Sequence, residues 1–143
     1  MYNEDVNDLI NHVSGDILYL DPPYNARQYC NNYHLLETSA KYDNPIIRGK
    51  TGLRDNKGQK SVFCEKGKVE KAFSHLIESA DFKYIFLSYN KDGLMSFDTI
   101  ENIMRQHGKY QVFTKDYRRY KADNTRENNT APTVEYLHCL IKE

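Results

Sequence analysis

One stretch decides the fold, Asp16-Ile17-Leu18-Tyr19-Leu20-Asp21-Pro22-Pro23-Tyr24-Asn25. Its continuous apolar run, residues 17–20, predicts a strand that is covered on both faces, as in a parallel α/β sheet. Asp21 follows at the end of this strand. Two prolines then fix the backbone and lack N–H donors, so their carbonyls become rigid acceptors. Because open α/β sheets bind ligands at the carboxyl ends of their strands, we expect a ligand site at this corner.

Composition and charge set the broad class. The chain has 143 residues, which suits a single domain, and its formal net charge is zero. Nucleic-acid binding must therefore rest on local clusters of charge. Cys30, Cys64 and Cys139 form no Cys-x-x-Cys pair, so we expect reduced thiols and no metal site. Without a signal peptide or a long apolar span, the chain is expected to be cytoplasmic and not membrane-bound.

Apolar periodicity predicts the elements around the corner. Helices are expected within residues 1–14, ended by Gly15, and over residues 28–42, 69–80 and 97–104, the last with Ser96 as its cap and ended by Gly108. Further strands are expected at 84–87, 111–114 and 134–141. This alternation indicates an α/β fold with parallel strands and helices on the sheet faces. The last two strands have no helix between them and should form an antiparallel hairpin.

The corner and the residues after it resemble a known family. Asp21-Pro22-Pro23-Tyr24, followed by Asn25-Ala26-Arg27-Gln28-Tyr29 and Tyr33-His34-Leu35-Leu36-Glu37-Thr38, is similar to the catalytic region of Dam-like, alpha-group N6-adenine DNA methyltransferases of restriction-modification systems. The resemblance implies a Rossmann-like methyltransferase sheet. It also implies S-adenosyl-L-methionine as methyl donor and double-stranded DNA with a flipped adenine as substrate.

The resemblance also assigns roles within the motif. Asp21 and the Pro22 carbonyl would each accept a hydrogen bond from the adenine amine, and preorganised acceptors of this kind stabilise the positive charge that develops on nitrogen. Pro23 completes the rigid corner, and Asp21 would also contact the cofactor. Tyr24 would stack on the flipped base, with a gain of roughly 1–3 kcal/mol against a flipping cost of similar size.

Two basic segments, residues 44–60 and 115–133, are candidate DNA contacts, and solvated loops are the alternative for both. The second interleaves tyrosines with cations, which suits stacking as well as phosphate binding. Tyr29 or Tyr33 could line the base pocket, or could serve only in helix packing. The candidate nucleic-acid-binding residues are Asn25, Arg27, Tyr33, Lys50, Arg54, Arg118, Arg119, Tyr120 and Asn124.

A cofactor motif of the family is missing from the sequence. The family places a Phe-x-Gly-x-Gly turn before the catalytic motif, and no Gly-x-Gly occurs here. Residues 1–143 are therefore expected to be a single partial catalytic domain without the N-terminal cofactor-binding half: a truncated product, one subunit of a split enzyme or an excised domain. The apolar edge strand, residues 17–20, predicts association with a companion half or a second copy. A non-catalytic nucleic-acid-binding remnant and an RNA guanine-amine methyltransferase remain alternatives.

Overall fold

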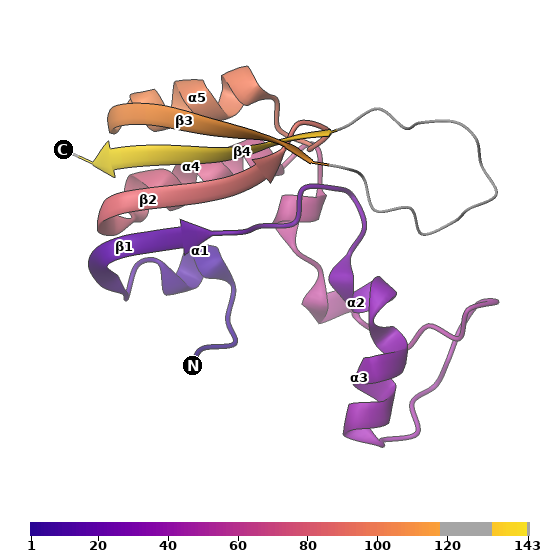
Figure 1. Ribbon diagram of the computed structural model, residues 1–143. Coiled ribbons are helices and arrows are strands. Elements are labelled where there is room, and N and C mark those ends of the chain that lie inside the picture. The colour runs from indigo at the N-terminus through magenta and orange to yellow at the C-terminus, as the bar shows by residue number, and fades with distance from the viewer. Residues whose placement is uncertain (118–132, 143) are drawn as a thin grey trace.

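A mixed β-sheet with helices packed against it forms the body of the protein in the computed structural model, which describes residues 1–117 and 133–142 (Figure 1). The elements, in chain order, are α1 (Val6–Leu9), β1 (Ser14–Leu20), α2 (Tyr29–Asn32), α3 (His34–Lys41), η1 (Lys57–Gln59), η2 (Val62–Cys64), α4 (Val69–Ser79), β2 (Asp81–Asn90), α5 (Phe97–Arg105), β3 (Gly108–Tyr117) and β4 (Thr133–Lys142).

The sheet has the strand order β1-β2-β4-β3. β1 and β2 are parallel, and β4 runs antiparallel to both of its neighbours. The predicted parallel pair and the predicted C-terminal hairpin are therefore confirmed. β3 runs in the same direction as β1 and β2, but the hairpin places β4 between β2 and β3. The carboxyl ends of β1 and β2 consequently meet at the same end of the sheet.

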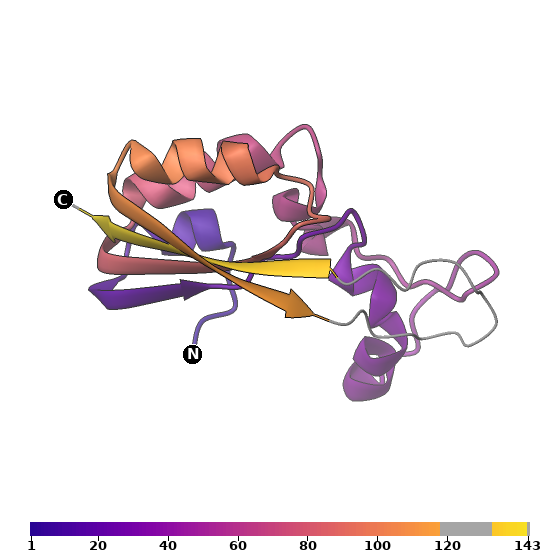
Figure 2. The same ribbon diagram turned by 45° about the horizontal axis from the view of Figure 1, so that its top comes forward.

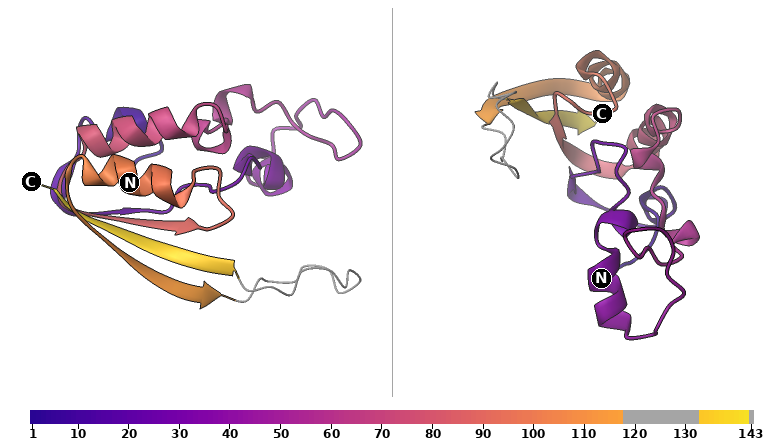
Figure 3. Two further views of the ribbon diagram at one scale, coloured as in Figure 1. Left: turned by 90° about the horizontal axis from the view of Figure 1, so that it is seen from above. Right: turned by 90° about the vertical axis from the view of Figure 1, so that its right-hand side faces the viewer.

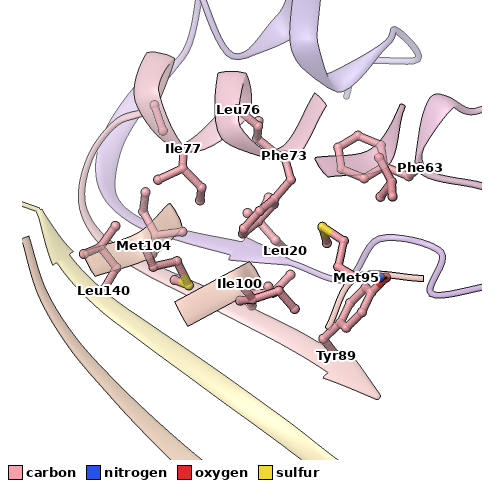
Figure 4. Packing of buried hydrophobic residues seen from close by; sticks show 14 of the residues in the cluster. Leu20, Phe63, Phe73, Leu76, Ile77, Tyr89, Met95, Ile100, Met104 and Leu140 are labelled. Atoms are coloured by element: carbon pink, nitrogen blue, oxygen red, sulfur yellow. The ribbon is translucent and has the colours of Figure 1, made fainter. Parts of the chain in front are cut away.

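The helices α1, α4 and α5 all pack on one face of the sheet (Figures 2 and 3). The apolar stripe of α4 is buried as predicted, with Phe73 and Ile77 inaccessible to solvent. These side chains belong to one core cluster with Ile85 of β2, and Figure 4 shows this cluster reaching Leu20 at the end of β1. This one-sided core fixes the end of β1, from which the corner begins.

The opposite face of the sheet is largely uncovered, so the prediction that the strand at residues 17–20 is covered on both faces is wrong. Ile17 is 62% exposed and Tyr19 is 61% exposed, whereas Leu20 on the helical face is buried. Register places Ile17 beside Tyr84, and Tyr19 beside Phe86, on this bare face. The reason is architectural, because α1, α4 and α5 all cover the other side.

Several element boundaries differ from those expected. The first helix is only α1, and Gly15 pairs with Phe82 inside β1 instead of ending a helix. The helix expected over residues 28–42 is interrupted at Tyr33, which separates α2 from α3. The Ser96 cap is confirmed, since its hydroxyl accepts a hydrogen bond from the Thr99 amide. α5 ends at Arg105, so the glycine at 108 instead begins β3.

No helix in residues 1–117 or 133–142 has both the length and the apolar character needed to cross a membrane. The three cysteines are free thiols in the structure, and Cys64 and Cys139 are buried.

Candidate active site

The Asp-Pro-Pro-Tyr corner leaves the sheet at the carboxyl end of β1, beside the end of β2. Leu20 is buried and anchors the strand, while Asp21 directly after it is exposed. No described residue forms an ion pair with Asp21, so its carboxylate is available to a ligand. The Tyr24 carbonyl accepts a hydrogen bond of 2.8 Å from the Leu94 amide, in the segment that follows β2. The corner is therefore held to the sheet at both of its ends.

A cavity of about 1050 Å³ opens at this corner. It lies between the end of β1 and the arm formed by α2 and α3, which extends away from the sheet in Figure 1. Its volume is at the upper end of the range typical of small-molecule sites, roughly 300–1,000 Å³. Its lining includes Asp21, Pro22 and Pro23 of the motif, together with Tyr29 and Tyr33 of the arm.

Two tyrosines of the arm form an aromatic wall of this cavity. The Tyr29 and Tyr33 rings meet edge to face, with their centroids 5.9 Å apart. Burial raises the pKa of Tyr29, and the negative charge of Asp21 raises it further. Tyr29 therefore keeps its hydroxyl proton, and Asp21 is close enough to act on it electrostatically. The interpretation of Tyr29 and Tyr33 as cavity-lining residues agrees with this placement.

The arm is fixed by contacts that sequence reasoning missed. The Gln28 side chain donates to the Ser61 carbonyl at 3.0 Å and accepts from the Ser61 amide at 2.8 Å. The Cys64 thiol donates to the Arg27 carbonyl at 3.4 Å. These partners lie more than thirty positions apart in sequence, and no local pattern marks them. Together they hold the start of α2, and with it Tyr29, against the segment that contains η2.

The other predicted residues near the corner have mixed placements. Tyr24 is 43% exposed and is not part of the cavity lining. The Asn25 side chain accepts from the Arg27 amide at 2.9 Å, which shapes the turn after the motif. The side chain of Arg27 is exposed. Roles for Tyr24, Asn25 and Arg27 in nucleic-acid binding stay predictions.

The two predicted DNA contacts in the first basic segment have different surroundings. Lys50 is exposed, in the turn closed by the Arg48–Leu53 bridge. Arg54 instead forms an ion pair with Asp43 and a hydrogen bond with Thr38, and its side chain is only 9% exposed. These contacts hold the loop against α3. Roles for Lys50 and Arg54 in nucleic-acid binding stay predictions.

The predicted DNA contacts in the second basic segment lie outside the described residues. They are Arg118, Arg119, Tyr120 and Asn124. In the described ranges, no group of three or more His, Cys, Asp or Glu side chains is arranged to hold a metal ion.

A mixed α/β sheet whose first strand ends in Asp-Pro-Pro-Tyr over a cavity is the arrangement expected of an amino-methyltransferase. The comparison with protein families agrees. The chain belongs to the D12 class N6 adenine-specific DNA methyltransferase family, whose sequence model matches residues 1–112.

Named relatives support this membership. The chain is 52% identical to the type II methyltransferase M.NlaIII of Neisseria lactamica, over 99% of this chain and 42% of that protein. It is 53% identical to the type II methyltransferase M.FokI of Planomicrobium okeanokoites, over 99% of this chain and 22% of that protein. It is 38% identical to the modification methylase StsI of Streptococcus sanguinis, over 89% of this chain and 20% of that protein. The chain thus spans less than half the length of these relatives. No solved structure matches it significantly.

Proposed function

We propose that residues 1–143 are a partial catalytic domain that transfers a methyl group from S-adenosyl-L-methionine to the N6 amine of adenine in DNA. The observation that carries this proposal is the placement of Asp21 and Pro22, which line a cavity at the end of β1 in a chain of the adenine methyltransferase family. Family membership supplies the reaction class, and the free carboxylate beside a proline carbonyl supplies the acceptors that the amine requires.

The proposed chemistry depends on two acceptors in fixed positions. The adenine amine is a weak nucleophile, because its lone pair is delocalised into the ring. Asp21 and the Pro22 carbonyl accept from its two N–H groups and so favour a pyramidal nitrogen. As the new N–C bond forms and the methyl–sulfur bond of the donor breaks, positive charge grows on this nitrogen, where the two acceptors would stabilise it. Loss of one N–H proton to solvent then leaves the neutral methylated amine. Proline fixes its own backbone, so little reorganisation is needed when the charge appears.

We assign the stacking of the base to aromatic rings at and near the corner. A base that is modified inside DNA must leave the helix, at a cost of a few kcal/mol. Stacking on Tyr24 offsets this cost by roughly 1–3 kcal/mol. Tyr29 and Tyr33 line the cavity and offer a second aromatic surface to the extruded base. Lys50 and Arg27, both exposed, are the described cations that we assign to the DNA backbone.

The cofactor fits this chain only in part. Bound S-adenosyl-L-methionine supplies an electrophilic methyl group, and Asp21 is the residue that we assign to its binding here. The cavity has room for more than a nucleobase. The sequence, however, lacks the Gly-x-Gly turn expected to hold most of the cofactor. We therefore assign that part of the site to a companion methyltransferase half.

The bare sheet face supports the need for a companion. Within the described part of the chain, β1 pairs only with β2, so its other edge has unpaired backbone groups. Ile17, Tyr19 and Phe113 are each more than half exposed, and register places all three on this face. We propose that a companion half, or failing that a second copy, covers it. Tyr19→Lys should abolish the association in sedimentation, and a stable wild-type monomer in the companion's presence would contradict it.

Segment exchange tests the catalytic proposal directly. The matching segment of M.NlaIII, 42% of that protein, is replaced by this chain, and tritium transfer from labelled cofactor to duplex DNA is measured. We expect transfer by the exchanged enzyme and its loss in the Asp21→Ala variant, with cofactor binding by calorimetry as a separate readout. A folded exchange enzyme without transfer would favour the non-catalytic remnant, and transfer to RNA alone would favour the guanine-amine alternative.

A further inference from the structure

We propose that the end of β2 and the turn after it, residues 89–95, position the Asp-Pro-Pro-Tyr corner, with Tyr89 and Gly93 as the positioning residues. The inference deepens the proposed function and rests on it. Neither residue lines the cavity, so both would act through the backbone of the corner.

A backbone hydrogen bond joins the turn to the corner. The Leu94 amide donates to the Tyr24 carbonyl at 2.8 Å, across seventy positions of sequence. Pro22 and Pro23 have no N–H groups, so two of the four residues of the motif cannot donate backbone hydrogen bonds. The corner therefore depends more on its carbonyl acceptors, and the Leu94 amide binds the one at Tyr24.

The buried side chain of Tyr89 packs against the turn and binds its backbone. Its side chain is only 3% exposed, and its hydroxyl accepts from the Met95 amide at 3.3 Å. In Figure 4, Tyr89 and Met95 lie close to each other at the end of the core. Because Met95 directly follows Leu94, the hydroxyl of Tyr89 restrains the peptide segment that carries the donor to the corner.

Gly93 allows the turn to lie against this ring. A Cβ atom at position 93 would stand 2.2 Å from Cε1 of Tyr89 and 3.0 Å from the Asn90 carbonyl oxygen. Carbon atoms do not approach this closely, and the Tyr89 ring is buried and cannot move aside freely. Any larger residue at 93 must displace the turn, and with it the adjacent Leu94 amide.

The far side of the turn is anchored to β4. The Asn90 side chain accepts from the Asp92 amide at 2.8 Å and from the Thr133 hydroxyl at 3.2 Å. The Lys91 amide donates to the Val134 carbonyl at 3.0 Å. These contacts fix the turn to the sheet, so the Leu94 amide holds Tyr24 against a rigid support.

This arrangement has a kinetic consequence. Moving the Leu94 amide shifts Tyr24 and, through two stiff prolines, the acceptors Pro22 and Asp21. These acceptors contribute most when charge develops on nitrogen, so misplacement should lower kcat and leave the KM for DNA nearly unchanged. A shift of about 1 Å can cost on the order of a hundredfold in rate.

The kinetic test uses the M.NlaIII enzyme that carries this chain. We expect Gly93→Ala to lower kcat at least tenfold, and Tyr89→Phe to lower it several-fold, with the KM for DNA of each variant within about twofold of the parent. Gly67→Ala is the matched control, because a Cβ at that glycine meets nothing within 4 Å. In the Tyr89→Leu background, where the ring is gone, Gly93→Ala should cost little further. An unchanged kcat in folded Gly93→Ala and Tyr89→Phe enzymes, or a loss entirely in KM, overturns the proposal.

Amide hydrogen exchange on the 143-residue chain separates this inference from the proposed function, because it needs no activity. The Leu94 amide should be protected in the parent chain and in Gly67→Ala. It should exchange faster in Gly93→Ala and in the isosteric Tyr89→Phe, which keeps the test open if Gly93→Ala does not fold. An inactive parent enzyme with this exchange pattern defeats the catalytic proposal alone. Equal Leu94 protection in all folded variants defeats the positioning proposal.

Discussion

The hydroxyl oxygen of Tyr110 lies 2.7 Å from Nδ1 of His138, and both side chains are buried between the sheet and α5. Phe97 and Tyr136 contribute rings on either side, with centroids 5.5 Å and 5.7 Å from that of the histidine. Burial lowers the pKa of His138 to about 4, and the charge of Glu101 only partly opposes this. Burial likewise raises the pKa of Tyr110 to about 12. Both groups are therefore neutral near pH 7.

This buried histidine predicts how stability depends on pH. The unfolded chain takes up a proton at His138 below its ordinary pKa near 6.5, whereas the folded chain resists it until about pH 4. The stability that comes from keeping His138 neutral is fully present above pH 6.5 and is lost as the pH falls toward 4. The free energy of unfolding should drop by up to about 3 kcal/mol across this window. Urea denaturation at several pH values measures it.

The double variant Tyr110→Phe/His138→Phe is the control for that measurement. It removes the titrating group and its hydrogen-bond partner together, so no polar atom is stranded in the interior. We expect the drop between pH 6.5 and 4 to shrink by most of its size. The prediction fails if the parent and the double variant show the same pH dependence.

Lys142 should stabilise the chain by closing the end of a helix. Its ammonium donates to the carbonyls of Ile77, Glu78 and Ala80, at 2.9, 2.8 and 2.6 Å. These carbonyls belong to the last turn of α4 and the residue after it, where intrahelical donors are lacking. Lys142→Met keeps the apolar stem and removes the donors, and should cost about 1–2 kcal/mol of unfolding free energy. Lys71→Met, at an exposed position of α4, should change it little.

Sequence patterns predicted the elements whose signal is local. The spacing of Val69, Phe73, Leu76 and Ile77 predicted α4, because helix packing repeats its apolar face every three or four residues. The missing helix between the last two strands predicted their hairpin. The corner was predictable because Asp21 and the prolines directly follow an apolar strand, and strand ends are where α/β sheets bind ligands.

Long-range contacts carry no such local signal. The pairing of Gln28 with Ser61, and of Leu94 with Tyr24, depends on how distant segments meet in space. Arg54 was predicted to contact DNA because it is a cation in a basic segment. In the structure it forms an ion pair with Asp43 and a hydrogen bond with Thr38. The apolar run at β1 indicates which residues can be buried. It does not indicate that α1, α4 and α5 cover only one face of the sheet.

Gly108 should be intolerant of any side chain. Its φ is +147°, and a Cβ atom would lie 2.1 Å from the Ile141 carbonyl oxygen across the β3–β4 pair. Gly108→Ala should therefore strain the start of the hairpin and cost about 1–3 kcal/mol of unfolding free energy. Thermal unfolding followed by circular dichroism gives the measurement. Gly58→Ala serves as control, since it has open space around its Cα, and an equal effect of the two substitutions would argue against the strain.

Replacing Lys50 by alanine should affect DNA binding, whereas replacing Arg54 by alanine should affect stability. Lys50→Ala removes an exposed cation, so we expect weaker binding to DNA of any sequence and a salt dependence reduced by about one phosphate contact. Arg54→Ala breaks the ion pair with Asp43, so it should lower the urea midpoint and leave the salt dependence of DNA binding unchanged. Fluorescence anisotropy across a salt series, in the M.NlaIII enzyme that carries this chain, compares the two variants. If Arg54→Ala lowered the slope of log affinity against log salt concentration by a full unit, Arg54 would be a DNA contact. An arginine that only holds a loop releases no counterions on DNA binding.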